Sequence, residues 1–486
     1  MQDLKCHYLL FTLFIFGVFS ANHASNQLDH NSLLSLLLDS SNSTPFNGSS
    51  INCCHWEGIS CDHKGRVTHL WLPSKGLKGS ISPSLGNLTR LSHLNLSHNS
   101  LTDLLPTGLF SFLNQLKIID LSNNHLGGQL PSGIGGCSKL KIFWAGFNSF
   151  SGFFPHDIYN AAALEEISLP SNNLSGHMNN EIMNLTKLTS LELYQNQLIS
   201  NLPLNIGKLS KLKQLILHTN YLTGSIPSWL STLPRLNSID LSNNLFSGEL
   251  PKIFCGLQAL ISQSEDDNSS LTLPVLSIQS DNVVTEIKSL NFWFRIIRIS
   301  NNSLSGTIPI EIGCLKALRM LDLGYNKLVG TIPTEISKLT ELEKLDLSAN
   351  KLYGEILVSL SNLHFLNEFN VSNNNLHGAI PVGTQLQSFD ASAFEGNPEL
   401  FGLPLPECSH ITSSKRDENI QEEDKFTIPW FQVTIMLGFI TGFWGVCAPL
   451  ALNQNWRVAY FQFFDKLKDE FFVKLEVFMA RFHGRL

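Results

Sequence analysis

Charged residues are scarce in this chain: they make up only 15% of its 486 residues, against 43% hydrophobic residues. The net charge is −7 and the isoelectric point is near 6.1, so there is no basic surplus with which to bind nucleic acid. The sequence also lacks a ligand-spaced cysteine and histidine cluster, a phosphate-binding loop and a nucleophile motif. We therefore expect no cofactor, no metal site, no nucleic-acid partner and no enzymatic activity.

The chain is rich in a repeated element, LxxLxLxxN, whose asparagine recurs at an almost constant step. The step is about 24 residues, a period that indicates a solenoid, because each unit buries its apolar side only against its neighbours. A chain of this length has enough apolar residues for a large stacked core. It also has 33 glycines and 20 prolines, which suit the turns between repeats. The asparagines are Asn99, Asn124, Asn148, Asn172, Asn196, Asn220 and Asn244, then Asn302, Asn326, Asn350 and Asn374.

One unit shows how the repeat folds. In the stretch from Leu212 to Asn220 the leucines alternate as the inward face of a short strand does. Stacked units therefore predict an α/β solenoid with one parallel sheet on its concave face. Asn220 turns the chain, and its amide is expected to bond to backbone groups that the turn leaves unpaired. The outward positions of this unit are Lys213, Gln214, Ile216, His218 and Thr219.

The spacing of the ladder asparagines changes once, between Asn244 and Asn302, where it is more than twice the usual spacing. No LxxLxLxxN lies between them, so the gap is best explained as one repeat plus a long insertion, centred on the stretch 262–294. We call residues 262–293 the island. Its stretch 270–278 is rich in β-forming residues, and an exposed strand edge there would accept an extended peptide by strand addition. The island residues assigned to that contact are Leu271, Leu273 and Val275.

Further candidate ligand contacts lie next to the island. Arg295 and Arg298 offer guanidinium groups suited to a sulfate or carboxylate, although each is equally explained as the decoration of a strand. The concave positions of the nearby repeats are chemically mixed, and most of them also fit a merely solvated sheet face. Those assigned to ligand binding are Tyr194, Lys213, His218 and Asp240, with Glu192 and Asn237 beside them.

The amino-terminal residues 1–24 carry Lys5 ahead of an apolar run and then small residues, which is typical of a cleaved secretory signal. Asn-x-Ser/Thr sequons follow in a number that suits a glycosylated extracellular domain. The predicted glycosylation sites are Asn42, Asn47, Asn87, Asn95, Asn173, Asn184, Asn268, Asn301 and Asn370.

The carboxy-terminal part predicts a membrane anchor. Residues 409–425 are polar and acidic, and residues 426–452 are apolar without a charge and long enough to span a bilayer. Residues 453–486 carry lysines and arginines among aromatic residues at helical spacing, which indicates an amphipathic helix on the inner membrane surface. The orientation is then single-pass type I with an extracellular amino terminus. Within the span, Gly438 and Gly442 have the GxxxG spacing that lets two helices approach closely.

Three stretches carry a resemblance to known families. The run from Cys53 to Cys61, CCHWEGISC, resembles the amino-terminal cap of plant leucine-rich-repeat ectodomains. The stretches around the island, with GTQ at 383–385 and FEGNP at 394–398, resemble plant receptors for tyrosine-sulfated peptides, namely the phytosulfokine and tyrosine-sulfated glycopeptide receptors. The carboxy terminus, including GFWGVC at 442–447, resembles receptor-like proteins of the fungal-xylanase-receptor kind.

These resemblances carry implications for fold and partners. They imply a plant-type leucine-rich-repeat superhelix, a disulfide between Cys54 and Cys61, and a peptide hormone that pairs with an island strand. They also imply an adaptor receptor kinase bound through the transmembrane helix and a somatic-embryogenesis-type co-receptor kinase near the carboxy-terminal repeats. The family closes its far end with a disulfide that cannot form here, because Phe401 replaces the partner of Cys408. The cysteines Cys137, Cys255 and Cys314 fit small buried hydrophobic residues.

The predicted organisation follows in order along the chain. It is a signal peptide at 1–24, an amino-terminal cap at 25–66, repeats 1–8 at 67–261, the island at 262–293, repeats 9–12 at 294–387, a carboxy-terminal cap at 388–408, an acidic stalk at 409–425, a transmembrane helix at 426–452 and a cytoplasmic tail at 453–486.

Three functions remain open on this sequence. The tail at 453–486 is too short for a kinase, so a receptor of this form would signal through partner kinases. The first hypothesis is a plasma-membrane receptor-like protein for an extracellular peptide, either tyrosine-sulfated or derived from a pathogen, in growth or defence. The second is a decoy that binds peptide or co-receptor without signalling. The third is an apoplastic inhibitor of microbial wall-degrading enzymes.

Overall fold

The structure is a computed structural model of the whole chain, and it describes residues 26–38, 52–252, 254–262, 275–278, 284–287, 295–382 and 385–405. The chain divides into two compact units, Met1–Ser409 and His410–Leu486, and all described residues belong to the first. No helix within these ranges is long and apolar enough to cross a membrane. The predicted signal peptide, stalk, spanning segment and tail, with Gly438 and Gly442, lie outside the described residues.

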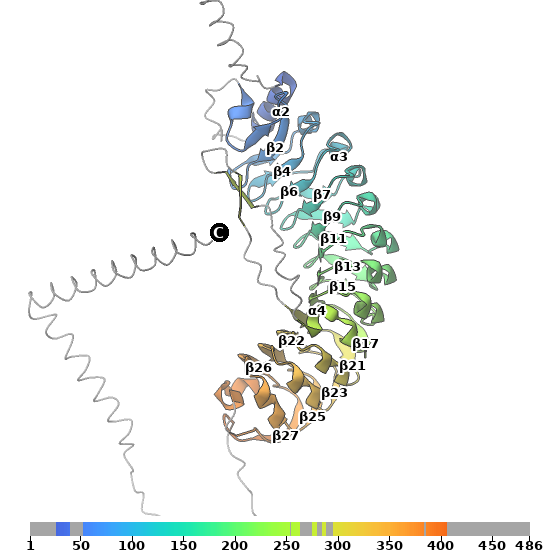
Figure 1. Cartoon of the computed structure of the whole chain (residues 1–486), viewed down its shortest axis with the longest axis vertical. Coiled ribbons are helices and arrows are strands. Elements are labelled where there is room, and N and C mark those ends of the chain that lie inside the picture. Colours follow the sequence, from blue (N-terminus) through green and yellow to red (C-terminus); the bar gives the residue numbers. More distant parts are fainter. Residues whose placement is uncertain are drawn as a thin grey trace, which may run out of the picture. The chain divides into compact units, whose positions relative to one another are not determined.

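A 13-stranded sheet runs through the described part of the first unit, and its strands follow one another in chain order, as Figure 1 shows. Only its first pair, β1 (Ile59–Cys61) with β2, is antiparallel. This confirms the predicted solenoid with one long parallel sheet. The parallel strands are β2 (Val67–Trp71), β4 (His93–Asn95), β6 (Ile118–Asp120), β8 (Ile142–Trp144), β10 (Glu166–Ser168), β12 (Ser190–Glu192), β14 (Gln214–Ile216), β16 (Ser238–Asp240), β20 (Ile296–Arg298), β22 (Met320–Asp322), β24 (Lys344–Asp346) and β26 (Glu368–Asn370).

The central residue of each short strand points into the core, and its two neighbours face the concave surface. Leu191, Leu215 and Ile239 illustrate this, being fully buried or nearly so in successive strands. Their inward side chains are aligned because each strand pairs in register with the next. The core is therefore one continuous column of leucine, isoleucine and phenylalanine side chains rather than a set of separate clusters.

The recurring asparagines form a buried ladder, as the sequence predicts. The Asn220 carboxamide oxygen accepts from the Leu198 N–H at 2.9 Å, one repeat earlier. Its amide nitrogen donates to the carbonyls of Leu193 at 3.0 Å and Leu217 at 3.1 Å. Each such side chain thus satisfies backbone groups of its own repeat and of the preceding one, which a strand ending in a turn leaves unpaired. The residue before it, Thr219, has a φ of 56°, the sharp turn that ends the strand.

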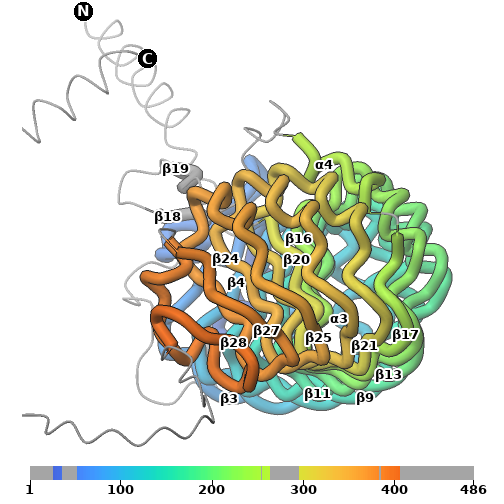
Figure 2. Tube along the Cα trace, turned by 90° about the horizontal axis from the view of Figure 1, so that it is seen from below, coloured from blue at the N-terminus to red at the C-terminus, as the bar shows by residue number. Residues whose placement is uncertain are grey.

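The convex side consists of short strands and 3-10 turns. Side strands follow the asparagines and form smaller sheets; they are β3 (Lys78–Ser80), β5 (Ser100–Thr102), β7 (Gly127–Gln129), β9 (Ser149–Phe153), β11 (Asn173–Gly176), β13 (Gln197–Ser200), β15 (Tyr221–Leu222), β17 (Ser247–Glu249), β21 (Ser303–Ser305), β23 (Val329–Gly330), β25 (Lys351–Gly354) and β27 (Asn375–Ala379). A turn of helix then closes most repeats; these are η2 (Pro83–Asn87), α3 (Leu109–Phe112), η3 (Ile134–Gly136), η4 (His156–Asn160), η5 (Asn180–Asn184), η6 (Leu204–Lys208), η7 (Ser228–Thr232), η8 (Phe254–Gly256), η10 (Ile310–Cys314), η11 (Thr334–Lys338) and η12 (Val358–Asn362). Figure 2 shows the repeats as successive coils of one tube.

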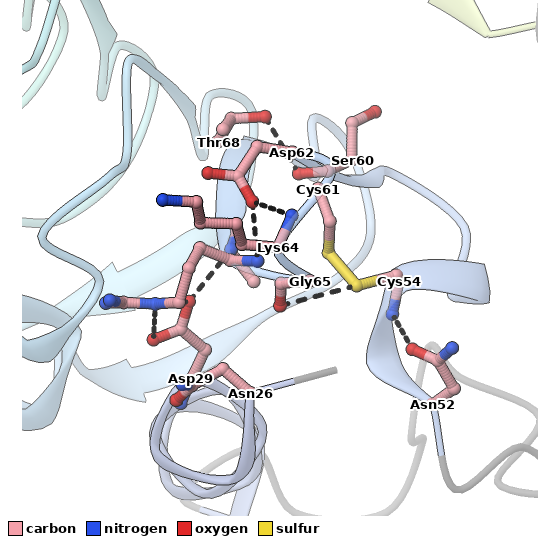
Figure 3. The surroundings of a disulfide bond; sticks show 12 residues. Asn26, Asp29, Asn52, Cys54, Ser60, Cys61, Asp62, Lys64, Gly65 and Thr68 are labelled. Carbon is pink, nitrogen blue, oxygen red and sulfur yellow. Dashed lines mark hydrogen bonds and ion pairs between the residues drawn. A yellow bond between two sulfur atoms is a disulfide. The ribbon is translucent and has the colours of Figure 1, made fainter. Parts of the chain in front are cut away.

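The amino-terminal cap covers the open end of the core with α2 (Gln27–Leu38) and η1 (Cys53–His55). The disulfide implied by the resemblance, Cys54 to Cys61, is present and is drawn in Figure 3. Asp29 of α2 is fully buried, and both of its oxygens lie within 3.1 Å of the Arg66 Nε. It also accepts from the Val67 N–H at 2.8 Å, which fixes the helix to the first repeat. This charge-assisted contact compensates for burying a carboxylate.

The island leaves the solenoid after α4 (Gln258–Ile261) and does not interrupt the sheet. β16 pairs directly with β20, and Asp240 is in register with Arg298. The ladder also continues across the gap, since the Phe246 N–H donates to the Asn302 oxygen at 2.9 Å. Of the island itself the structure describes two strands, β18 (Val275–Ile278) and β19 (Val284–Ile287), which form an antiparallel pair.

A second disulfide joins Cys255 to Cys314, with the Cα atoms 5.2 Å apart. The expectation that these two are buried apolar residues is therefore wrong, whereas the third cysteine of that prediction, Cys137, is a buried free thiol as predicted. The reason is topological: η8 and η10 become neighbours once the island is looped out. Cys255 and Cys314 follow their ladder asparagines, Asn244 and Asn302, at nearly the same spacing, so the equivalence of the two positions is visible in the sequence.

The carboxy-terminal cap closes the solenoid without the family's disulfide among the described residues. β28 (Glu399–Phe401) pairs with β27, so Phe401, the residue that the resemblance places at a cysteine position, lies in a strand, and Cys408 lies outside the described residues. Asn397 adds one more rung to the ladder, because its oxygen accepts from the Leu376 N–H at 3.0 Å and its nitrogen donates to the Val371 carbonyl at 3.0 Å. This rung was not predicted, although Asn397 follows Asn374 by almost one full repeat. Two short turns, η13 (Gln385–Ser388) and η14 (Ala391–Ala393), complete the cap.

Candidate functional site

The concave face of the repeats on either side of the island carries a group of aromatic and charged side chains, which we call the central track. It consists of Tyr194, His218, Asp240, Arg298 and Asp322. Asp240, Arg298 and Asp322 are adjacent residues of the paired strands β16, β20 and β22. The parallel pairing in register therefore places residues that are far apart in the chain side by side.

An aromatic pair forms one end of the track. The rings of Tyr194 and His218 are stacked, with centroids 4.5 Å apart and planes inclined by 18°. The His218 Nδ1 lies 3.1 Å from the Thr219 hydroxyl, which holds the ring in place. Burial lowers the pKa of His218, with Arg298 acting in the same direction and Asp240 against it. The pair thus presents a flat and mainly uncharged surface to the concave side.

An arginine clamped between two carboxylates forms the other end. The Arg298 Nη1 lies 3.1 Å from the Asp240 Oδ2, and its Nε lies 3.5 Å from the Asp322 Oδ2. Asp240 is only 3% exposed, and its other oxygen accepts from the Ser242 N–H and hydroxyl at 3.0 and 2.6 Å. Burial, and the nearby Asp346, raise the pKa of Asp322. The charge of Arg298 is therefore already neutralised, and an incoming anion has to compete with two carboxylates for it.

An acidic pair lies beside the track. Glu166 is buried, and burial together with Glu192 raises its pKa to about 7, while the Trp144 indole N–H that donates to it acts in the opposite direction. Glu192 in turn accepts from the Ser168 hydroxyl at 2.8 Å and from the Ser190 hydroxyl at 3.2 Å. Burial, with the charge of Glu192 acting in the same direction, therefore favours the protonated form of Glu166 up to near neutral pH.

The remaining predicted contacts fall in three places. Lys213 is half-buried on the concave side, and Arg295 is only 7% exposed, so its guanidinium is not simply displayed to solvent. Val275 begins β18, whose one edge is occupied by β19, so strand addition there would have to use the other edge. Leu271 and Leu273 lie outside the described residues.

A hollow near the carboxy-terminal end was not predicted. It has a volume of about 420 Å³ and lies where β24 and β26 meet the cap. Its walls include Lys344, Asp346 and Asn370, together with Phe369 and Phe389, whose rings stack at 5.8 Å. β26 is the last strand of the concave sheet. Its free edge therefore faces the hollow and not another strand of that sheet. The sequence contains a sign of this hollow: the strand motif of the concave sheet occurs for the last time at Asn370, whereas apolar core residues continue to Phe394.

The sequons differ in their accessibility. Asn87, Asn173, Asn184 and Asn301 are exposed, and Asn370 is half-buried, whereas Asn42, Asn47 and Asn268 lie outside the described residues. Asn95 is only 5% exposed, its nitrogen donates to Asp120 at 3.2 Å, and its oxygen accepts from the Ser97 N–H and hydroxyl. The Asn95 amide is therefore much less accessible in the folded chain than the four exposed sequons, and its glycosylation stays a prediction.

Comparison with known proteins agrees with the repeat architecture. Family profiles described as leucine rich repeat match residues 294–352, and also residues 90–112, 115–137, 211–233 and 235–257. A crystal structure of a TDR receptor superposes with a TM-score of 0.55 at 29% identity, covering 64% of this chain and 48% of that one. The match covers a large part of the chain that the structure describes.

Two similar proteins are plant receptors or receptor-like proteins. The receptor-like protein EIX2 of Solanum lycopersicum is 53% identical over 224 residues, which is 45% of this chain and 22% of that protein. Phytosulfokine receptor 1 of Arabidopsis thaliana is 44% identical over 88 residues, which is 18% of this chain and 9% of that protein. The chain thus spans less than a quarter of either relative. The chain contains leucine-rich repeats, and it is similar over part of its length to plant receptor-like proteins and plant leucine-rich-repeat receptors.

Proposed function

We propose that the protein is a cell-surface receptor-like protein that binds an extracellular peptide on the central track, next to the island, and signals through partner receptor kinases. The observation that carries the proposal is the continuity of the sheet across the island. The island is inserted between β16 and β20, the strands that carry Asp240 and Arg298, and the direct pairing of these strands leaves the two side chains in contact. A long insertion between two strands of a concave sheet fits ligand capture better than structural support.

The relatives support a peptide as the ligand. Phytosulfokine receptor 1 is named for its ligand, and the island region of the present chain resembles that of receptors for tyrosine-sulfated peptides. The track offers a flat aromatic pair, Tyr194 with His218, and a polar group, Arg298 with its two aspartates. A short extended peptide with one aromatic and one charged side chain would be complementary to both ends.

The sign of the ligand charge can be read from two variants. If the ligand presents a sulfate or carboxylate to Arg298, Asp240→Asn frees the guanidinium and strengthens binding, and Arg298→Met weakens it. If the ligand presents a cation to Asp240 and Asp322, both effects change sign. The probes are phytosulfokine and its unsulfated form, titrated into the glycosylated full chain. Arg319→Met is the matched control, because Arg319 is exposed one repeat further on and is paired with Glu343 at 3.6 Å.

The outcomes separate the peptide class from the site. Equal affinity for sulfated and unsulfated peptide removes the sulfated-ligand assignment. The central track is not the binding site if neither Asp240→Asn nor Arg298→Met changes the affinity for any peptide and the control Arg319→Met also has no effect.

Signalling is tested separately from binding. We expect an adaptor receptor kinase to co-purify with the full chain from plasma membranes and to be lost when Gly438 and Gly442 are both replaced by leucine. The hollow lined by Lys344, Asp346 and Phe389 lies at the carboxy-terminal repeats, where the resemblance implies a co-receptor kinase. Peptide binding without any associated kinase would favour a decoy, and inhibition of a microbial wall-degrading enzyme by the chain would favour the third function.

A further inference from the structure

Asn370 is a sequon asparagine that lies in the wall of the hollow at the carboxy-terminal end of the concave sheet. It is the last residue of β26, which is the last strand of that sheet (Figure 1). The Val371 N–H, directly after it, already donates to the Ala393 carbonyl of the cap at 2.8 Å. The sheet edge is therefore uncovered only along β26, and Asn370 lies where the hollow meets the cap.

The same motif occurs in an inner strand, where Asn95 is the last residue of β4. In both strands the carboxamide oxygen accepts from the N–H of the serine two positions later, at 2.9 Å for Asn95 and 3.0 Å for Asn370. β6 pairs with β4 on its outer side, so Asn95 is only 5% exposed and its nitrogen donates to Asp120. No strand of the sheet follows β26, and the Asn370 Nδ2 donates to no other described residue. The two sequons thus have the same local fold, but only Asn370 keeps its amide nitrogen free.

The hollow suits a sugar ring. Its volume is about 420 Å³, within the range of about 300 to 1,000 Å³ that is usual for small-molecule sites. The Asp390 carboxylate bonds to no described residue, and only one Asp346 oxygen is occupied, by the Ser348 N–H and hydroxyl at 2.9 and 2.6 Å. Phe389, stacked on Phe369, adds an apolar wall. A pyranose has hydroxyl groups on its rim and C–H groups on its faces, so the carboxylates and the phenyl ring both match it.

We propose that Asn370 carries an N-linked glycan whose first N-acetylglucosamine lies in the hollow and covers the open end of the concave sheet. In the attachment, the Asn370 nitrogen forms a bond to C1 of the sugar and loses one proton. The lipid-linked oligosaccharide that donates the sugar loses its diphosphate as the leaving group, and neither partner is oxidised or reduced. An uncovered sheet edge pairs readily with other chains, and a solenoid needs its ends covered. The glycan does at this end part of what a further strand would do.

This glycan changes what a partner would contact at the carboxy-terminal repeats. A co-receptor kinase that binds there would contact the sugar rather than the walls of the hollow. The central track lies on other strands, from β12 to β22, so peptide binding does not depend on the glycan. Failure of either proposal therefore leaves the other standing.

The first test uses the full chain produced in plant cells with all its glycans. Peptide mass spectrometry should find a glycan on Asn370. Peptide-N-glycosidase acting on the native protein should release that glycan at least tenfold more slowly than the glycan of Asn173, an exposed asparagine of β11. After denaturation the two glycans should be released at equal rates. An unoccupied Asn370 in the folded protein, or equal release rates from the native protein, overturns the proposal.

The second test removes the glycan by mutation. Ser372→Ala destroys the sequon but keeps Asn370 and the N–H that bonds to its oxygen. We expect hydrogen exchange of the backbone amides at 367–371 to become several-fold faster. The matched control is Ser175→Ala, which removes the glycan of Asn173 and should leave exchange at 367–371 unchanged. Asn370→Gln also lacks the sugar but keeps Ser372, so an acceleration common to both variants reports the sugar and not a lost side-chain contact. Unchanged exchange in Asn370→Gln contradicts the covering role.

Discussion

Cys255 and Cys314 form a disulfide across the place where the island leaves and re-enters the solenoid, although 59 residues separate them in the chain. The bond joins the turns η8 and η10, which stack on the convex side of neighbouring repeats. The two halves of the solenoid are thus linked covalently by a path that does not pass through the island. The sheet and the asparagine ladder supply the noncovalent part of the same link.

A cut within the island should therefore leave the solenoid assembled. We expect limited proteolysis between residues 263 and 293 to give one band on a non-reducing gel and two fragments on a reducing gel. The circular dichroism of the nicked chain should match that of the intact chain, because β16 and β20, the strands on either side of the island, pair directly with each other. A control chain with Cys255→Ser and Cys314→Ser should release two fragments under both gel conditions. Separation of the parent fragments without reductant would contradict the disulfide assignment.

Removal of one ladder asparagine should destabilise the stack. Asn220→Ala leaves the Leu198 N–H and the carbonyls of Leu193 and Leu217 without their partner inside the protein. Unsatisfied buried groups cost about 1 to 3 kcal/mol each, and partial relaxation makes a total loss of roughly 3 kcal/mol our expectation. The measurement is the midpoint of denaturant unfolding. The exposed Gln197→Ala in the preceding repeat serves as control, and equal midpoints for the two variants would refute a bonding role.

Glu166 should make the stability fall as the pH rises. The Glu166 pKa is about 7 in the folded chain against 4.5 for the free group, so between these values the folded state holds a proton that the unfolded state has lost. The free energy of unfolding therefore declines through this window, by about 3 kcal/mol in full. Glu166→Gln should abolish the decline and be the more stable protein at pH 8. Glu165→Gln, whose parent carboxylate is partly exposed and paired with Lys141, should retain it.

Glycan occupancy should follow accessibility rather than the sequon alone. We expect mass spectrometry of the secreted or membrane-bound chain to find glycans at Asn87, Asn173, Asn184 and Asn301 and none at Asn95. An attached sugar at Asn95 would replace one of the two N–H groups of an amide that is only 5% exposed and would have to occupy the packed concave surface. A substantial glycosylated fraction at Asn95 in correctly folded protein would contradict this arrangement.

The period of the asparagines was enough to predict the solenoid, the parallel sheet and the position of the island, because each repeat contacts mainly its neighbours. The contacts that depend on three-dimensional neighbourhood were harder to see. The clamping of Arg298 requires knowing that Asp240, from the other side of the island, lies in the adjacent strand. The same reasoning would have found Cys255 with Cys314, since the two occupy equivalent positions of adjacent repeats.

Other features needed the structure itself. The burial of Asn95 could not be predicted from its sequon, because a strand asparagine that accepts from the serine two positions later also satisfies Asn-x-Ser. The raised pKa of Glu166 depends on its burial and on the nearby Glu192, and side-chain packing is not contained in the repeat pattern. The hollow at β26 results from the sheet ending before the core does.

The ladder also determines how a chain of this kind can change in length over evolution. Each asparagine bonds only within its own repeat and to the repeat before it, as Asn220 does with Leu193 and Leu198. A duplication or deletion of one whole unit therefore leaves every remaining asparagine with equivalent partners. An insertion of any other length is compatible with the ladder only if the additional residues form a loop between two successive ladder asparagines. Residues 262–293 are such a surplus, and the unbroken bond from Phe246 to Asn302 shows that the rungs on either side still match.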